Sequence, residues 1–495
     1  MDNPIRPSHS SPTARNLKSY YNVDRNAFIS TYLKEAHDRS LKIATETPIG
    51  AMCINNAVRY IIGDGLFPQS SPERIWLNWT DEQARTFSTE AEAFFRIITG
   101  SKEFDYYGKD NFPALQRVAF RNILIHGDVL VHRSYFGKAK NYRPYIQLLS
   151  GSWVRNPDMS GVDTKNQIAG VELDDRNREV GYWIAVTDEN NLDTFSSKKV
   201  SKYNRTTGFE EYDLIKLGAL EANQVRGIPY LTAVEESILD LDAMENAYRT
   251  KAIVQAMFTV FIEKDKDAPE SATTLKDDAK ALALGMKSEE NDFEATDVEI
   301  KLGPGNVFTL NEGEHVNMAE SKIATVDFIG MRKALLLDIG SALGLPRGLL
   351  EQEFNSSFSA SKAEINSAYK GFKVVMQEVG DKVCTPTWEQ VVDYGIRLGV
   401  INAPGYLEAD ELTKKAMLAV TWIGPTAVSI DPVKEVNAQV AMIAAGLTTR
   451  ERAIRELNGM DFDEVSQRLA QENAKLKELG LTEEPSTIEE KEEDE

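Results

Sequence analysis

The stretch QVRGIPYLTAVEESILDLDAMENAYRTKAIVQAMFTVFIEK, residues 224–264, decides how the rest of the chain can fold. Pro229 and a capping-box pattern of Thr232 with Glu235 predict the start of a helix, and no further glycine or proline occurs until Pro269. The predicted helix has about thirty residues, or roughly 45 Å of length at 1.5 Å per residue. A helix this long needs a packing partner along its surface.

The apolar residues of this helix change their distribution half-way. The first half predicts one buried stripe, formed at three- and four-residue spacing by Val234, Ile238, Leu241, Met244 and Tyr248. From Ala252 onward the residues are apolar on nearly all sides, so this end should be covered on most sides. The apolar run is too short to cross a bilayer. Taken alone, the pattern fits the central helix of a globular enzyme.

The composition is that of a globular protein with several domains. The 495 residues, 42% of them hydrophobic and 9% aromatic, suggest roughly three packed domains. The net charge of −21 argues against tight, sequence-independent DNA binding, which needs Lys and Arg to displace counterions, but it permits loose contact with DNA.

Cys53 and Cys384 are too few for a disulfide framework and are expected in the core. The N-terminus has no apolar signal segment, which predicts synthesis inside the cell without secretion.

Helices and strands are segregated in the part of the chain before residue 224. Helices are predicted over about 24–46, 48–62, 80–98 and 111–125, with Thr47 and Pro48 opening the second. Short β-branched or aromatic runs, separated by Gly, Asp and Asn turns, predict strands over 128–136, 145–149, 168–173, 181–186 and 212–217. This order favours an α+β fold over a doubly wound α/β sheet.

A small module is predicted between two long helices. Residues 265–319 are charged and contain the turn Gly303-Pro-Gly305, which is typical of an insertion with short strands. The second long helix is predicted over about 321–343 and ends before Gly344-Leu-Pro346.

The C-terminal third is predicted to be mainly helical. A polar loop over 351–361 precedes a long helix over about 360–398, with a bend expected near Gly371, Gly380 or Pro386. Three more helices are predicted over about 432–445, 449–458 and 461–479. The glutamate run that follows predicts a disordered acidic tail.

No local motif for catalysis or cofactor binding is present. The phosphate-binding G-x-x-x-x-G-K-[ST] pattern is missing, and the five histidines form no H-E-x-x-H pair. His126 and His132 flank a predicted strand, but we favour a structural over a catalytic interpretation for both. Adjacent carboxylates such as Asp174-Asp175 fit a solvated turn. We therefore expect no catalytic residues, no metal and no cofactor.

Three stretches together resemble a known family. They are QVRGIP at 224–229, FSASKAEIN at 358–366, and the part from Trp422 to Leu481 with Gly446-Leu-Thr and Gly459-Met-Asp461. In this order, over about residues 24–481, the chain resembles the portal proteins of tailed bacteriophages, specifically the lambda-like portal family. One departure is Phe358-Ser359, where the family usually has Tyr-Ser, so that a phenol hydroxyl is lost.

The resemblance implies an α+β portal fold with wing, two-helix stem, small α/β clip, kinked tunnel helix and helical crown, assembled as a ring. Carried onto this chain, it implies a disordered N-terminal arm over 1–22, a wing over 23–230, stem helices over 231–262 and 319–345 around a clip over 263–318, a tunnel-loop region over 346–361, a tunnel helix over 362–395, a crown over 396–481 and a disordered acidic tail over 482–495.

The resemblance also implies a non-enzymatic conduit for double-stranded DNA, located at one vertex of the virion and in the host cytoplasm during assembly. The implied partners are other copies of the chain in a ring, typically a dodecamer, double-stranded DNA, the terminase large subunit, a head-completion or tail adaptor protein, the major capsid protein and a scaffold protein, with no membrane. The residues expected to contact DNA are Phe354, Asn355, Ser356, Ser357, Phe358, Lys362, Arg332 and Lys333.

Two other classes of function remain open at this point. One is a hydrolase whose carboxylates come together from distant segments, since such acids need no local motif. The other is a structural head protein through which no DNA passes. The basic residues expected to contact DNA also fit an ordinary solvated helix face.

Overall fold

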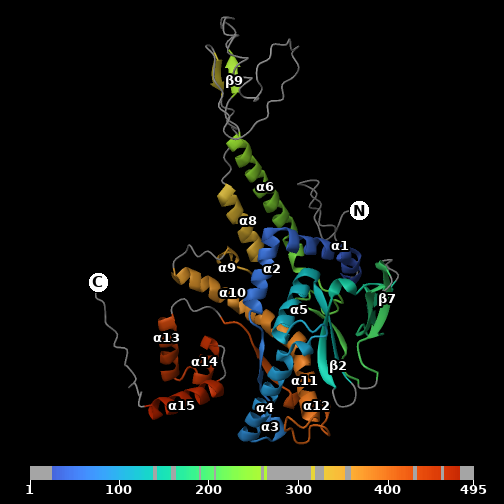
Figure 1. Ribbon diagram of the computed structural model, residues 1–495, viewed down its shortest axis with the longest axis vertical. Coiled ribbons are helices and arrows are strands. Elements are labelled where there is room, and N and C mark those ends of the chain that lie inside the picture. The colour runs from blue at the N-terminus through green and yellow to red at the C-terminus, as the bar shows by residue number, and fades with distance from the viewer. Residues whose placement is uncertain are drawn as a thin grey trace, which may run out of the picture. The chain divides into compact units, whose positions relative to one another are not determined.

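The computed structural model describes residues 25–137, 142–157, 163–164, 166–188, 191–205, 208–257, 261–264, 314–317, 328–351, 358–426, 432–458 and 462–479. The chain forms two compact units, one from residues 1–235 with 337–495 and one from residues 236–336 (Figure 1). The described residues combine helices with small antiparallel sheets, which confirms the predicted mixture of helix and sheet. None of the described helices is both long enough and apolar enough to span a membrane.

The larger unit begins with helices whose caps the sequence predicts correctly. Thr47 accepts a hydrogen bond from Gly50 N, and Thr80 forms a complete capping box with Gln83. Asn111 accepts from Ala114 N at the start of the last of these helices. The helices are α1 (Arg25–Glu46), α2 (Pro48–Ile61), α3 (Arg74–Leu77), α4 (Asp81–Gly100) and α5 (Phe112–His126), with a 3₁₀ turn, η1, at Lys102–Phe104.

Two antiparallel sheets follow in the same unit. The first has the order β3-β2-β8 and the second β4-β5-β6-β7. Their strands are β2 (Asp128–Phe136), β3 (Arg143–Ser150), β4 (Gln167–Ile168), β5 (Val171–Leu173), β6 (Glu179–Asp188), β7 (Asn191–Ser201) and β8 (Tyr212–Lys216), with a 3₁₀ turn, η2, at Gly151–Trp153. The run predicted as one strand over 168–173 is two, because Ala169 and Gly170 adopt positive φ and turn the chain. Strand β7 was missed, because its sequence is largely polar.

The C-terminal part of the larger unit returns to the N-terminal helices. Strand β1 (Phe67–Ser70) pairs antiparallel with β11 (Val420–Ile423), with Phe67 opposite Ile423 and Ser70 opposite Val420. The remaining helices are α9 (Arg347–Glu351), α10 (Phe358–Val379), α11 (Thr385–Arg397), α12 (Glu411–Met417), α13 (Pro432–Ala444), α14 (Arg450–Asn458) and α15 (Phe462–Glu478). The three predicted C-terminal helices are thus confirmed.

A π-helical turn, η5 at Gly380–Cys384, joins α10 to α11. Gly380 lies against the indole of Trp422, where an added Cβ would stand 2.8 Å from the ring. The interruption of the long helix expected near Gly380 is therefore confirmed, and its form is a π-turn.

The smaller unit contains α6 (Glu235–Met257) and α8 (Phe328–Ala342), which extend across its boundaries, and the antiparallel pair β9 (Phe261–Lys264) and β10 (Glu314–Asn317). The sequence-based end of the first long helix, at 262 or 264, is wrong. The residues Val260, Phe261 and Ile262 favour a strand, and the ladder with β10 overrides the helical continuation.

The predicted capping box at the start of the long helix is also wrong. Residues Tyr230–Ala233 form a 3₁₀ turn, η3, before the helix, and the buried Thr232 hydroxyl has no hydrogen-bond partner. Glu235 instead lies 3.8 Å from Arg39 of α1. The N-terminal arm, the acidic tail and most of the predicted clip lie outside the described residues.

Candidate functional site

Arg226, from the QVRGIP stretch, is a buried side chain at a junction of several segments of the larger unit. Its side chain is 1% exposed and uses all five N–H donors. Nε and Nη2 bind the two carboxylate oxygens of Asp128 at 2.6 and 2.9 Å. The other donors bind the carbonyl oxygens of Gly151, Val154 and Ala169, each at 2.7 Å. One side chain thus ties the start of β2 to the segments before β4 and β5.

The carboxylate of Asp128 is fully buried and stays ionised. Burial by itself would raise the pKa of Asp128, but the charge and hydrogen bonds of Arg226 outweigh it and lower that pKa below its ordinary value. Gly227 N also donates to Asp128 Oδ2 at 3.0 Å. A buried pair with this many hydrogen bonds fixes geometry, and it offers no vacant position for a substrate.

The backbone around Arg226 is held from two further sides. Val225 N donates to Asn26 Oδ1 of α1 at 2.8 Å, and Gln224 Nε2 donates to the Arg226 carbonyl at 2.7 Å. Gly127, with φ +85°, ends α5 directly against Gly227, so that two glycines allow the two backbones to touch. We infer that QVRG is an architectural junction. Sequence reasoning did not find this role, because Arg226 and Asp128 are 98 residues apart.

Two buried histidines lie next to this junction. The rings of His37 in α1 and His126 at the end of α5 are 5.4 Å apart and perpendicular. His37 Nε2 and His126 Nδ1 have no hydrogen-bond partner. Burial, with Arg226 nearby, lowers the pKa of His37 to about 3, and burial lowers the pKa of His126 as well. Both rings are therefore neutral in the folded protein.

Acidification should destabilise the larger unit through these histidines. The folded pKa of His37 lies below the ordinary value of 6.5, so only the unfolded chain gains protons as the pH falls from 6.5 toward 3. His37 should cost about 1.4 kcal/mol of unfolding free energy per pH unit in that window and nothing above it, and the lowered pKa of His126 acts in the same direction. Denaturant melts at pH 7, 6 and 5 measure the slope. His37→Leu should reduce it, and an identical slope in both proteins would refute the assignment.

The residues expected to contact DNA are only partly placed. Phe354, Asn355, Ser356 and Ser357 lie outside the described residues, as does the side chain of Phe358, whose backbone begins α10. Lys362 is half-buried on α10, and Lys333 is exposed on α8. The described residues therefore do not test whether these side chains form one site.

Arg332 is engaged within the smaller unit. Its Nε lies 2.9 Å from Glu245 Oε1, and Arg249 approaches Glu245 Oε2 at 3.6 Å. One helical turn farther along α6, Tyr248 stacks on Phe328 of α8 with ring centroids 4.3 Å apart. These contacts hold α6 and α8 side by side and confirm that the first long helix has the second as a partner.

Two acidic residues that line a hollow in the larger unit are paired with lysines. A cavity of about 490 Å³ lies beside β8 and is lined by Glu179 and Asp213. Glu179 lies 3.0 Å from Lys216, and Asp213 lies 3.2 Å from Lys202. Among the described residues, no three His, Cys, Asp or Glu side chains are grouped so as to hold a metal ion. Nothing in this arrangement favours the hydrolase alternative.

Comparison with known proteins settles the family. The model of the family "Phage portal protein, lambda family" matches residues 14–375, most of the chain. The chain therefore belongs to the lambda family of phage portal proteins. Portal protein B of Escherichia phage lambda is 23% identical over 439 residues, which cover 85% of this chain and 80% of that protein. The portal protein of Escherichia phage N15 is 23% identical over 441 residues, with the same coverage of both chains.

Solved structures that match the chain include chains from gene transfer agent particles. A chain of "Neck of empty GTA particle computed with C6 symmetry" has a TM-score of 0.49 and 13% identity, covering 84% of this chain and 93% of that chain. A chain of "Virion of native gene transfer agent (GTA) particle" has a TM-score of 0.48 and 12% identity, covering 87% and 93%.

Proposed function

We propose that copies of this chain form a ring, with twelve subunits as the expected number, at one vertex of the virion. The ring is a conduit through which a terminase packages double-stranded DNA and through which the DNA is later ejected. It also provides the platform to which the tail connector attaches. The observation that carries this proposal is the match of the lambda-family portal model over residues 14–375.

The smaller unit supports a ring through the apolar side chains that it leaves exposed. On α8, Ile329 is 64% exposed and Met331 is 44% exposed. Tyr248 on α6 is 51% exposed despite its stacking on Phe328. A closed ring would cover such side chains against neighbouring copies of the same two helices.

The parts of a portal follow from this proposal with one changed boundary. We assign the wing to 23–230, the stem to α6 and α8, the tunnel helix to 362–395 and the crown to 396–481. The clip, expected over 263–318, takes in β9 and therefore starts near residue 261, because the stem helix ends at Met257. The tunnel-loop region remains 346–361.

The DNA-contact residues are proposed to be Phe354, Asn355, Ser356, Ser357, Phe358, Lys362, Arg332 and Lys333. Of the two basic residues on the stem helix α8, Lys333 is the better candidate for DNA contact, because the charge of Arg332 is already neutralised by Glu245. A net charge of −21 suits a conduit, since tight binding would obstruct a moving polyanion.

Further partners follow from the same proposal. They are the terminase large subunit, a head-completion or tail adaptor protein, the major capsid protein and a scaffold protein. The ring would assemble in the host cytoplasm and end in the virion.

Electron microscopy of the purified full-length chain tests the ring. We expect closed rings with a central hole, and native mass spectrometry should give a single subunit number. A monodisperse monomer under conditions that favour assembly would overturn the proposal.

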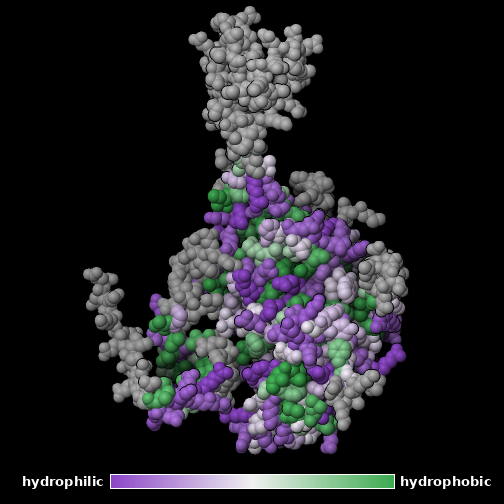
Figure 2. All heavy atoms as spheres, in the orientation of Figure 1, coloured by the Kyte–Doolittle hydropathy of each residue, from purple (hydrophilic) through white to green (hydrophobic). Residues whose placement is uncertain are grey.

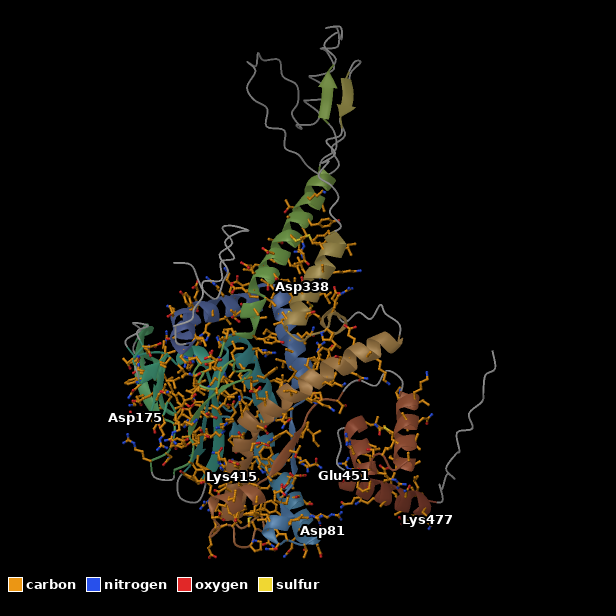
Figure 3. All side chains as sticks on the ribbon, turned by 180° about the vertical axis from the view of Figure 1, so that it is seen from behind. Asp81, Asp175, Asp338, Lys415, Glu451 and Lys477 are labelled. Carbon is orange, nitrogen blue, oxygen red and sulfur yellow. The ribbon has the colours of Figure 1, made fainter. Side chains whose placement is uncertain are left out.

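A deletion separates a DNA conduit from a structural head protein. Removing residues 352–357 should leave rings intact but sharply reduce the DNA packaged per particle, because the loop is proposed to contact DNA. Lys333→Glu should reduce packaging to a smaller extent, and Lys477→Glu near the end of α15 serves as the surface control (Figure 3). Normal packaging by the deletion variant would favour the structural head protein.

A further inference from the structure

The C-terminal helices carry two heptad patterns. Numbering the heptad from Val433, positions a and d of α13 are Val433, Val436, Val440 and Ile443. In α15 the same positions are Phe462, Val465, Leu469, Glu472, Leu476 and Leu479. We name these two sets the α13 seam and the α15 seam. An a/d repeat over two heptads is the pattern by which helices pair in coiled coils.

The described chain leaves both seams largely uncovered. Val433, Val436 and Val440 are 61%, 47% and 58% exposed on the α13 seam. Leu469 and Leu476 are 55% and 42% exposed on the α15 seam. Among the described side chains of α13, α14 and α15, Ala453 alone is buried. Figure 2 shows hydrophobic surface along α13 in the same region. These helices therefore lack a core of their own.

We propose that the α13 seam of each copy packs against the α15 seam of its neighbour in the assembled ring. This inference rests on the proposed ring function. A ring needs a head-to-tail interface, in which two different surfaces of the chain meet. One chain carries both seams, so each copy supplies one half of the contact on each side. Pairing of α13 with α13 would give a two-fold dimer and could not close a larger ring.

The flanking residues suit this pairing. The α13 seam is bordered at the e and g positions by Asn437, Gln439 and Ala444, which are uncharged. The α15 seam is bordered at the g positions by Arg468 and Lys475. Because the residues that border the α13 seam are uncharged, these two cations would face no like charge in the pair. Glu472, the one charged seam residue, interrupts the α15 seam, and a single polar residue at such a position sets the register of a pair at some cost in stability.

The size of the seams explains why the contact needs the ring. The α13 seam has four residues and the α15 seam has six, against roughly 20–30 residues a side in an ordinary stable interface. Two free copies should therefore not associate through the seams alone. Inside a ring, where other contacts already hold neighbours together, the same seams act at a high effective concentration.

Crosslinking in the full-length ring tests the pairing. Rings of the double variant Val440→Cys with Leu469→Cys, first verified by electron microscopy, are treated with a short bis-maleimide and separated under denaturing conditions. A ladder from dimer to the full ring is expected. The natural cysteines contribute little, because Cys53 and Cys384 are buried and burial raises the pKa of the Cys53 thiol to about 12.

Matched controls fix the interpretation. The double variant Lys434→Cys with Lys477→Cys places both thiols at b positions outside the seams and should give no ladder. Intact rings of the seam variant without a ladder would overturn the pairing and leave the ring function standing. Dimers from Val440→Cys alone would also overturn it, because they would show α13 pairing with itself. Absence of rings would refute the ring function and this inference together.

Discussion

Replacing Arg226 with Met is expected to unfold the larger unit. The substitution leaves Asp128 as an unpaired, fully buried carboxylate and removes the donors to three buried carbonyl oxygens. Breaking a buried ion pair costs about 3–5 kcal/mol, and each orphaned buried acceptor adds about 1–3 kcal/mol. The sum is comparable with the whole stability of a domain, about 5–15 kcal/mol. The variant should be insoluble, or should lose the cooperative melting transition in calorimetry.

The exposed pair of Arg178 with Asp174 provides a matched control. Arg178 is 69% exposed on its side chain and lies 2.8 Å from Asp174. Arg178→Met should therefore change the unfolding free energy by less than about 1 kcal/mol. Adding Asp128→Leu to Arg226→Met should restore part of the stability, since the buried charge disappears while the carbonyls remain unpaired. A soluble Arg226→Met protein with an unchanged melting temperature would contradict the central role of this side chain.

Replacing Gly227 with Ala is the second change with a large expected effect. An added Cβ would overlap the backbone carbonyl of Gly127, and neither partner is a flexible side chain that could move aside. Overpacking in a close-packed core usually costs about 1–3 kcal/mol. Here the cost should be at the upper end or above, because separating the two backbones also weakens the hydrogen bond from Gly227 N to Asp128. Denaturant unfolding of the purified variant measures the loss.

Gly371 is the control for this substitution. It lies within α10, and nothing stands within 4 Å of an added Cβ. Gly371→Ala should be neutral or stabilise the protein by up to about 1 kcal/mol, because alanine favours a helix interior. If Gly227→Ala were as mild as Gly371→Ala, the tight approach of the two glycines would not be a constraint on the fold.

The sequence predicted local structure where local chemistry decides it. Thr47, Thr80 and Asn111 mark helix starts correctly, because a capping side chain bonds its own helix. The resemblance through QVRGIP and the C-terminal stretch also led to the correct family. The Thr232 cap failed, because tertiary contacts placed a 3₁₀ turn there and directed Glu235 toward Arg39.

Other features depended on residues distant in sequence. The helix through Lys264 was a reasonable local prediction, but pairing of β9 with β10, about 50 residues onward, converted its end into a strand. The sequence showed Arg226 as part of the QVRGIP motif. It did not predict that Arg226 is buried or that Asp128 is its partner, because residue spacing carries no information on such a distant pair. Among the candidate DNA-contact residues, the ion pair of Arg332 with Glu245 makes Arg332 a weaker candidate than Lys333.

The sequence alone determined the class of fold, most element positions and the portal family, because periodicity, capping and motif order are properties of neighbouring residues. Only the tertiary structure decided what QVRG does. Arg226 stabilises the junction because five donors meet five acceptor positions from distant segments in a site without water access. Burial and long-range pairing make Arg226 the side chain that joins these segments of the larger unit, and both arise only when the chain is folded.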